Sequence, residues 1–307
     1  MAKYIIKRLL LLVPVLLVVS FLVFFLMSHA GDPVSMMTGD YATEAEIEAL
    51  RESMGLNDPL VIRYFNYMKD LFQGNLGKTL YGHDVLKELT SRLPYTVALS
   101  VVSIIITIII SLPFGIIAAV KQNSWLDTGL SATAMAGISI PDFWVGLMFA
   151  FVFAIRLRCL PASGAESWTG IIMPAVCLGI NNCAVLTRMT RSSMVDVIRA
   201  DYLRTARAKG VGERDVILKH ALKNALIPIL TIVGSQVVIL LGGSVVIESL
   251  FAWPGLGSYV VTCIRSCEYI AATSIILFQT TLTAVLLLCV DVLYAYVDPR
   301  IKARYTK

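Results

Sequence analysis

The feature that most limits the fold of this 307-residue chain is a series of apolar runs, each long enough to cross a lipid bilayer. Only 15% of the residues are charged, and the mean hydropathy is +0.76. A bilayer offers the backbone no hydrogen-bond partners, so such runs are helices or barrel strands, and none alternates with the period of two that a barrel requires. We therefore predict an all-α membrane protein with six transmembrane helices, near residues 9–27, 95–120, 130–155, 171–187, 225–247 and 270–297.

The first run could belong either to a secretory signal peptide or to an uncleaved anchor. Its start is basic, and the tripeptide SHA at residues 28–30 loosely resembles a cleavage site. The apolar stretch continues to Met27, however, which exceeds the usual signal core of about 7–15 residues. We expect residues 1–29 to form a retained N-terminal anchor helix.

The distribution of basic residues predicts the orientation, because Lys and Arg concentrate in cytoplasmic loops. With six spans, both termini lie on one side of the bilayer. If that side is the cytoplasm, 17 of the 26 Lys and Arg residues lie inside and 9 lie outside. Nine of the inside residues fall in the loop 188–223, so orientation explains this basic block, and no nucleic-acid-reading module accompanies it. We predict cytoplasmic termini and no nucleic-acid partner.

Residues 30–94 are the only segment with the character of a soluble protein, and they are expected outside the membrane. Thr43, with Glu46 three residues on, predicts a capped helix that runs to about Met54 and stops at Gly55. Residues 59–72 suit a second helix. We expect this extracytoplasmic segment to be a cap that packs on the membrane core.

The sequence GNLGKT at residues 74–79 resembles a phosphate-binding loop. That motif needs four residues between its glycines, whereas only two stand here, and Phe72 occupies the place of the first glycine. The segment is also expected to face away from cytoplasmic ATP. We predict an ordinary glycine-rich turn, with no nucleotide site and no cofactor in this chain.

The basic loop is expected to contain two short amphipathic helices. Residues 193–209 predict a helix closed by Gly210, and residues 213–226 predict a second one after a turn. Apolar faces are expected to gather Val195, Ile198 and Tyr202 on the first helix, and Ile217, His220 and Ala221 on the second. Such a compact knob can dock in a groove of a partner protein or lie on anionic lipid, and the pattern leaves both open.

Part of this loop has a recognisable sequence. Residues 201–210 (DYLRTARAKG), followed by HALKNA from His220 and by Pro228, resemble the coupling loop of ABC-importer permeases of the peptide and nickel branch. Three further segments are similar to that family: the basic start at 4–8 leading to GDP at 31–33, FAWPGLG at 251–257, and DPRI at 298–301. The loop departs from the general permease signature at residues 204–206, which read Arg-Thr-Ala in place of Glu-Ala-Ala.

The resemblance implies a MetI-like ABC importer permease fold in a bacterial inner membrane. It implies four protein partners besides the lipid bilayer: a homologous second permease subunit, two cytoplasmic ABC ATPases that bind ATP and Mg, and an extracytoplasmic substrate-binding protein. The cargo expected is a small peptide, with nickel, a metal chelate or glutathione as alternatives. The residues expected to couple to the ATPases are Tyr202, Thr205, Ala206, Arg207, Ala208, Lys209, Gly210 and Gly212.

Polar side chains inside the spans are candidates for the translocation path. Asp142 follows Pro141 near the middle of the third span, where an ionisable residue marks a functional site by default. Because proline breaks a helix, Asp142 could instead cap a new helical segment, and a capping Asp can still line a path. Other polar residues could equally bond neighbouring helices. The path residues we predict are Asp142, Asn181, Asn182, Gln236 and Gln279, with Ser235 and Thr280 as further polar positions.

Three other predictions concern charges and cysteines. Asp291, near the inner end of the last span, is expected to pair with Arg188 or Arg191. Cys263 and Cys267 are four residues apart, which permits a metal or a strained bridge, but two small helix-face residues are the simpler interpretation. No cluster has metal-ligand spacing and no nucleophile stands beside a base, so neither a metal site nor an enzyme is expected.

We thus divide the chain into an anchor (1–29), an extracytoplasmic segment (30–94) and a five-helix permease core (95–307) with a coupling loop at 188–226. The rival from another class is a secondary transporter driven by an ion gradient. That class usually carries midplane carboxylates or broken helices in paired halves. Asp142 is the only good midplane carboxylate here, and no matching segment appears in a second half.

Overall fold

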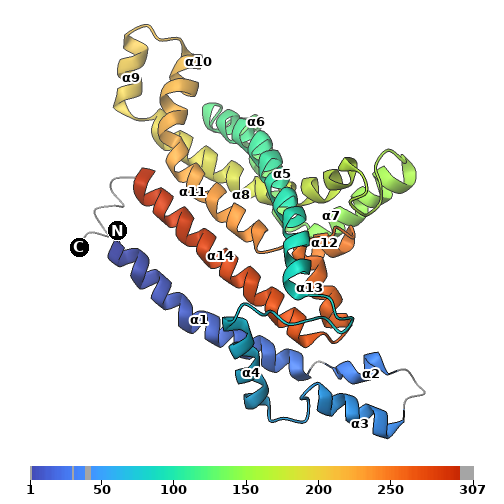
Figure 1. Cartoon of the computed structure of the whole chain (residues 1–307). Helices are drawn as coiled ribbons and strands as arrows, with labels where there is room; N and C mark the ends of the chain where they lie inside the picture. The colour runs from blue at the N-terminus through green and yellow to red at the C-terminus, as the bar shows by residue number, and fades with distance from the viewer. Residues whose placement is uncertain (1, 30, 39–42, 298–307) are drawn as a thin grey trace.

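The computed structural model describes residues 2–29, 31–38 and 43–297, and these are almost entirely helical (Figure 1). In chain order the α-helices are α1 (Ala2–His29), α2 (Pro33–Met37), α3 (Glu44–Ser53), α4 (Leu60–Phe72), α5 (Val85–Val120), α6 (Trp125–Ser139), α7 (Asp142–Phe149), α8 (Ile172–Ile198), α9 (Asp201–Ala208), α10 (Glu213–Asp215), α11 (Leu222–Leu241), α12 (Val245–Leu250), α13 (Leu256–Arg265) and α14 (Tyr269–Val297). A π-helical stretch (Ala150–Arg156) continues α7, and another (Val216–Ala221) joins α10 to α11. The predicted all-α class is confirmed, whereas the DPRI motif at 298–301 lies outside the described residues.

Five helical segments are long and apolar enough to cross a membrane, and they match five of the six predicted spans. They are Arg8–His29, Val85–Val120, Trp168–Ile198, Glu213–Leu241 and Tyr269–Leu293. The third predicted span, 130–155, is not one straight helix, because α6 and α7 bend by 96° at their junction. Pro141 stands at this junction and lacks the N–H that would continue the helix. Counted as one broken crossing, α6 and α7 bring the total to six.

Three predicted span ends are wrong. Helix α5 begins at Val85 rather than at residue 95, so residues 85–94, predicted as the end of the extracytoplasmic segment, belong to the helix of the second span. Helix α8 continues past residue 187 to Ile198, so the fourth span extends into the basic loop without a break. The fifth span ends at Leu241 rather than at residue 247, because Gly243 takes a left-handed φ of 100° and a separate helix, α12, follows. Glycine adopts that conformation at little steric cost.

A seam of small residues joins α5 to α8. Ser103, Thr107, Ser111 and Gly115 recur every fourth residue on α5 and are buried. The Thr107 hydroxyl donates to the Gly179 carbonyl at 3.2 Å, and the Ser111 hydroxyl donates to the Cys183 carbonyl at 3.1 Å. Small residues let two helix backbones approach closely, and hydroxyls then bond across the interface. These contacts hold α5 and α8 together as one unit.

The beginning of α1 lies beside the end of α14. Arg8 and Asp291 form an ion pair with 2.5 Å between Nη1 and Oδ2, so the prediction that Asp291 pairs with Arg188 or Arg191 is wrong. Helices α1 and α14 pack along each other in opposite directions, which brings these two side chains together, whereas Arg191 pairs with Asp127. The pair places the starts of the first span and the ends of the last span at the same end of the molecule.

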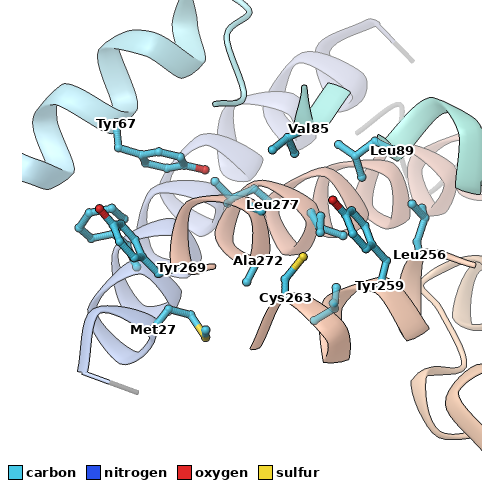
Figure 2. Packing of buried hydrophobic residues seen from close by; sticks show 14 residues of the cluster. Met27, Tyr67, Val85, Leu89, Leu256, Tyr259, Cys263, Tyr269, Ala272 and Leu277 are labelled. Carbon is cyan, nitrogen blue, oxygen red and sulfur yellow. The ribbon is translucent and has the colours of Figure 1, made fainter. Parts of the chain in front are cut away.

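The segment after α1 folds as predicted. The Thr43 hydroxyl accepts from the Glu46 N–H and the Glu46 carboxylate accepts from the Thr43 N–H, which confirms the capping box. Helix α4 presents Tyr67 to a buried cluster that also contains Leu89 of α5, Tyr259 of α13 and Tyr269 of α14, as Figure 2 shows. The Tyr67 hydroxyl lies 3.1 Å from the Ser274 hydroxyl. The segment is therefore a cap fixed on the helices that cross the membrane.

Figure 1 shows α9 and α10 projecting at one extreme of the molecule and α2 and α3 at the opposite extreme. We call the first extreme the loop end and the second the cap end. The turn GNLGKT at 74–79 belongs to the cap end, where Lys78 forms an antiparallel bridge with Asp84. It is an irregular turn between α4 and α5 rather than a strand-to-helix loop of the phosphate-binding kind.

Candidate functional site

The basic loop is a fixed helical projection at the loop end. Helix α9 lies between a turn at residues 199–200 and a glycine turn in which Gly210 has a φ of 80°. The Leu203 side chain is fully buried in a cluster with Met194 of α8 and Val216 of the π-helical stretch. Across the turn, the Arg207 guanidinium donates two hydrogen bonds to the Glu213 carboxylate, at 2.9 and 2.8 Å. The loop is therefore held in one shape by both apolar and ionic contacts.

The predicted single helix at 193–209 is wrong, because this segment is divided between α8 and α9. The chain breaks at Arg199 and Ala200, so Val195 and Ile198 end α8 while Tyr202 belongs to α9. Tyr202 is 44% exposed, and Leu203 is the residue that reaches the buried cluster. The break reorients α9 so that Leu203 rather than Tyr202 faces the core. On the second helix Ile217 and Ala221 are buried as predicted, but His220 is exposed.

The predicted coupling residues gather on one exposed projection. Thr205, Ala208 and Lys209 are exposed on α9 and its end, Ala206 and Arg207 are half-buried, and Gly210 and Gly212 form the exposed turn. Tyr202 is tied to the start of α11, because the Asn224 amide donates to its hydroxyl at 2.7 Å. Asn224 was not predicted as part of this site, although its place in the HALKNA motif was a signal. Contact with an ATPase remains a prediction.

Four of the predicted path residues lie at or against the middle of α8, and the fifth, Gln279, lies apart on α14. Asp142 is the first residue of α7, and its carboxylate accepts a hydrogen bond from the Asn181 amide of α8. Pro141, not Asp142, occupies the cap position, and no side chain caps α7, so the capping interpretation of Asp142 is wrong. The extended Pro141 instead directs Asp142 toward α8.

Asn182 of α8 and Gln236 of α11 extend these polar contacts from α8 to α11. The Gln236 amide donates to the Asn182 carbonyl at 3.0 Å, and the Asn182 amide donates to the Leu178 carbonyl at 2.8 Å. Gln279 lies apart on α14, beside Gly243, where an added Cβ would come within 2.7 Å of its Nε2. The structure thus brings four of the five predicted path residues to the middle of α8 and leaves Gln279 elsewhere.

An ion pair between buried Asp127 and partly exposed Arg191 fixes α6 to α8 nearer the loop end. The Arg191 guanidinium donates to both carboxylate oxygens of Asp127, at 2.5 and 2.6 Å. Asp127 is 4% exposed, and it also accepts from the Asn123 N–H at 2.9 Å. A planar guanidinium matches a carboxylate in this two-bond geometry. Asp127 was not predicted as a structural partner of the loop arginines.

Sequence reasoning also missed the acid at the centre of the FAWPGLG segment. Glu248 of α12 is fully buried, and its carboxylate accepts from the Ser258 N–H and from the Thr96 hydroxyl, each at 3.0 Å. The Thr96 hydroxyl oxygen accepts in turn from the Leu256 N–H at 2.9 Å. Glu248 thereby satisfies the free N–H groups at the start of α13, which favour a negative charge. Its signal was an isolated acid in an apolar stretch just before a glycine-rich motif.

Cys263 and Cys267 lie on different parts of the chain near the end of α13. Cys263 lies buried on α13, whereas Cys267 lies beyond the end of that helix with a φ of 54°, and both are free thiols. They therefore do not share a helix face as predicted. Burial raises the pKa of the Cys263 thiol to about 12. Within the described ranges, no three His, Cys, Asp or Glu side chains are grouped to hold a metal ion.

Comparison with known proteins covers almost the whole chain. Residues 111–303 match the family described as "Binding-protein-dependent transport system inner membrane component", and residues 1–100 match the N-terminal family of such membrane components. The chain is 42% identical over 304 residues to the glutathione transport system permease protein GsiC of Escherichia coli O6:H1, across 98% of this chain and 99% of that protein. It is 40% identical over 334 residues to the dipeptide transport system permease protein DppB of Alkalihalophilus pseudofirmus, across 98% of this chain and 100% of that protein.

The fold is also similar to that of a solved transporter. A chain of the inward-facing MetNI methionine ABC transporter superposes with a TM-score of 0.58 at 19% identity, over 69% of this chain and 97% of that chain. At 19% identity, this structural similarity shows a shared MetI-type fold and does not by itself indicate a shared function. With the family match and the two full-length relatives, it fits the multi-pass helical architecture described above. The chain therefore belongs to the family of binding-protein-dependent transport system inner membrane components, as a permease subunit of the dipeptide and oligopeptide branch of ABC importers.

Proposed function

We propose that this chain forms part of the path by which small peptides, delivered by an extracytoplasmic binding protein, enter the cell. A homologous second permease subunit completes the path, and two cytoplasmic ABC ATPases bind and hydrolyse ATP with Mg. The observation that carries this proposal is the 40–42% identity, over nearly the full length, to permeases named for dipeptide and glutathione transport. Glutathione is itself a tripeptide, so both names point to cargo of one chemical kind.

The shape of the loop supports a coupling role. Helix α8 enters the loop unbroken and the helical stretch from α10 to α11 leaves it unbroken, so the projection is fused to two spans. The buried Leu203 and the Arg207–Glu213 pair stabilise its shape, so the projection is expected to move as one body. A partner ATPase that moves α9 would therefore move α8 and α11 with it. Closure of the two ATPases can in this way change which side of the membrane the path faces.

The loop end is proposed to be cytoplasmic, with both termini on that side. The 17-to-9 division of basic residues supports the cytoplasmic side, and the neighbouring ends of α1 and α14 support placing both termini on one side. The test is labelling of single cysteines with an impermeant reagent in intact cells, in a variant without the six native cysteines. Cysteine at Gly82 should be labelled and cysteine at Gly212 should not. The opposite pattern would reverse the orientation.

The cargo is tested by uptake into proteoliposomes that contain the assembled complex with its own binding protein. Labelled di- to pentapeptides, glutathione and radioactive nickel are offered separately, and nickel is also offered as a chelate. Free nickel favours imidazole or thiolate ligands, whereas the proposed path residues are one acid and several amides. ATP-dependent uptake of peptides supports the proposal. Uptake of nickel or its chelate without uptake of peptides would replace it with the metal alternative.

The same vesicles test the rival class. Proteoliposomes that contain this subunit alone receive an ion gradient but no ATP. A secondary transporter would accumulate cargo under these conditions, and the proposed permease subunit would not. Gradient-driven accumulation by the isolated subunit would therefore contradict an ATP-driven importer.

A further inference from the structure

A cavity of about 420 Å³ lies between α6 and α8, on the loop-end side of the Asp142–Asn181 contact. Its wall near the loop end is polar and charged, and its wall near the middle of the membrane is apolar. The lining residues that define these two parts are Ser131, Arg188 and Arg191 at the polar part and Met135, Ile138 and Ala184 at the apolar part.

The polar part of this cavity carries one surplus positive charge. Asp127 and Arg191 also line the cavity, but their charges neutralise each other through the two-bond ion pair. Arg188 stands one turn of α8 nearer the middle of the membrane, and no Asp or Glu pairs with it among the described residues. Arg188 is exposed on the part of α8 that extends past residue 187, and an arginine near the end of a membrane-spanning helix lies toward water or a partner group. The cavity therefore favours an anionic group beside Arg188.

The opposite end of the same helix face carries a surplus negative charge. Asn181 precedes Arg188 by seven residues, which places both on one face of α8 about 10.5 Å apart along the axis. Asn181 contacts the Asp142 carboxylate, and the described residues hold no Lys or Arg paired with that acid. The end of α6 reaches this level, since a Cβ on Gly137 would lie 3.5 Å from the Ile180 carbonyl. Acid, cavity and guanidinium thus follow one another along α8.

We propose that Asp142 and Arg188 form the two charged ends of one site for a short zwitterionic peptide in transit. This inference rests on the proposed function and assigns it a recognition element. The α-ammonium group binds at Asp142 and Asn181, the α-carboxylate binds at Arg188, and the side chains lie against Met135, Ile138 and Ala184. The axial separation of about 10.5 Å between Asn181 and Arg188 is close to the extended length of about three residues, so the proposed site suits a tripeptide.

The test measures selectivity rather than total uptake. The complex with its own binding protein is reconstituted, and ATP-dependent uptake is measured for trialanine, trialanine amide and N-acetyl-trialanine. Each blocked peptide lacks the charge at one end. The binding protein has its own preference, but it is common to wild type and variants, so a change in the ratio of uptakes reports on the permease. The variants are Arg188→Gln, Arg188→Lys and Asp142→Asn, and the control is Arg158→Gln, an exposed arginine outside the cavity.

Arg188→Gln and Asp142→Asn should each change the uptake ratio for the peptide end that the substituted residue binds, and no other ratio. Arg188→Gln should lower the ratio of trialanine to trialanine amide by about tenfold, as expected for the loss of one hydrogen-bonded charge pair, and leave the ratio to N-acetyl-trialanine unchanged. Asp142→Asn should do the reverse. Arg188→Lys, which retains the charge, should keep most of the wild-type ratio, and Arg158→Gln should keep both ratios.

Two results would overturn the site. One is peptide uptake in wild type with the same amide ratio in Arg188→Gln, which would leave Arg188 without a role at the carboxylate. The other is an equal loss of both ratios in Arg188→Gln and Asp142→Asn, which would indicate general damage to the path. Failure of wild type to import any peptide would contradict the proposed function instead, so the two failures are distinguishable.

Discussion

The carboxylate of Glu248 lies so close to Gly255 that a Cβ at this glycine would come within 2.4 Å of Oε2. The φ of Gly255 is −88°, so the requirement for glycine here is one of space rather than of backbone conformation. Gly257 is similarly close, with 2.9 Å from an added Cβ to the same oxygen. The Trp-Pro-Gly-Leu-Gly sequence is thus folded around a buried acid that occupies the start of α13.

Gly255→Ala should destabilise the subunit, because the methyl group must displace the Glu248 carboxylate from its donors. Leaving buried hydrogen-bonding groups without their partners costs about 1–3 kcal/mol. The measurement is the melting temperature of the purified complex in detergent. Gly129→Ala in α6 is the matched control, since nothing lies within 4 Å of an added Cβ there. Equal melting temperatures for the two variants would contradict the steric argument.

Thr96→Val should also lower the melting temperature. Valine has a similar shape, but it removes the donor to Glu248 and the acceptor of the Leu256 N–H. Leaving buried polar groups without partners costs about 1–3 kcal/mol. Thr96→Ser retains the hydroxyl and should keep most of the stability. If serine were as damaging as valine, packing of the threonine methyl group rather than hydrogen bonding would explain the effect.

Removing Arg191 alone should lower the free energy of unfolding more than removing the charges of both Asp127 and Arg191. Arg191→Ala leaves the Asp127 carboxylate without its guanidinium partner, and the loss of hydrogen bonds to a charged group typically costs about 1.5–3 kcal/mol. Asp127→Asn in the Arg191→Ala background removes that charge and should recover part of the loss. Chemical unfolding of wild type, both single variants and the double variant measures the coupling. Additive effects of the two substitutions would show that the pair contributes little.

Glu268 should make stability depend on pH. Burial raises the pKa of this carboxyl above its usual value of 4.5, and the Leu80 N–H and His83 oppose the shift. The folded protein therefore binds a proton more readily than the unfolded chain. This contribution to stability is fully present below pH 4.5 and is lost as the pH rises through the raised pKa. Glu268→Gln cannot titrate, so its melting temperature should gain more over wild type at about pH 8 than at about pH 5. The same difference at both values would contradict the shift.

Lys209→Glu should weaken the docking of the ATPases without unfolding the permease. Lys209 is exposed at the end of α9, where its charge is available to a docked ATPase or to anionic lipid. Losing an anchor of an interface costs about 2 kcal/mol or more, which should lower both ATPase co-purification and cargo-stimulated ATP hydrolysis. Lys121→Glu makes the same change of charge in the turn between α5 and α6 and should have little effect. Wild-type values for Lys209→Glu would favour contact of the loop with lipid.

The apolar runs predicted the helices well because a bilayer leaves the backbone no alternative. Five spans, the capping box at Thr43 and the cap helices follow from local rules of hydropathy and hydrogen bonding. The bend at Pro141 was foreseeable as a break but not as a turn of 96°, since its size depends on the packing of α7 against α8 and α12. Local pattern thus predicts where a helix stops but not where the chain goes next.

The candidate site was predicted only in part, and the failures have one cause. Asp291 with Arg8, Asp127 with Arg191, and Glu248 with Thr96 each join segments whose distance depends on the packed fold. A sequence lists the charges but does not choose among several partners of opposite sign. Asn181 and Asp142 were both named as path residues, yet their direct contact needed the geometry of α7 against α8.

Helix α8 runs without a break from Asn181 to Ile198, so it fixes the rotation about the helix axis, or phase, of residues at the loop end relative to residues at the middle of the membrane. Every residue inserted or deleted in this stretch would turn one end against the other by about 100° and shift it by about 1.5 Å. Such a change would leave the composition of the helix almost intact while rotating α9 away from its position. Length in this part of the chain is therefore as strict a requirement as residue type, whereas the turns at the cap end can gain or lose residues without disturbing that phase.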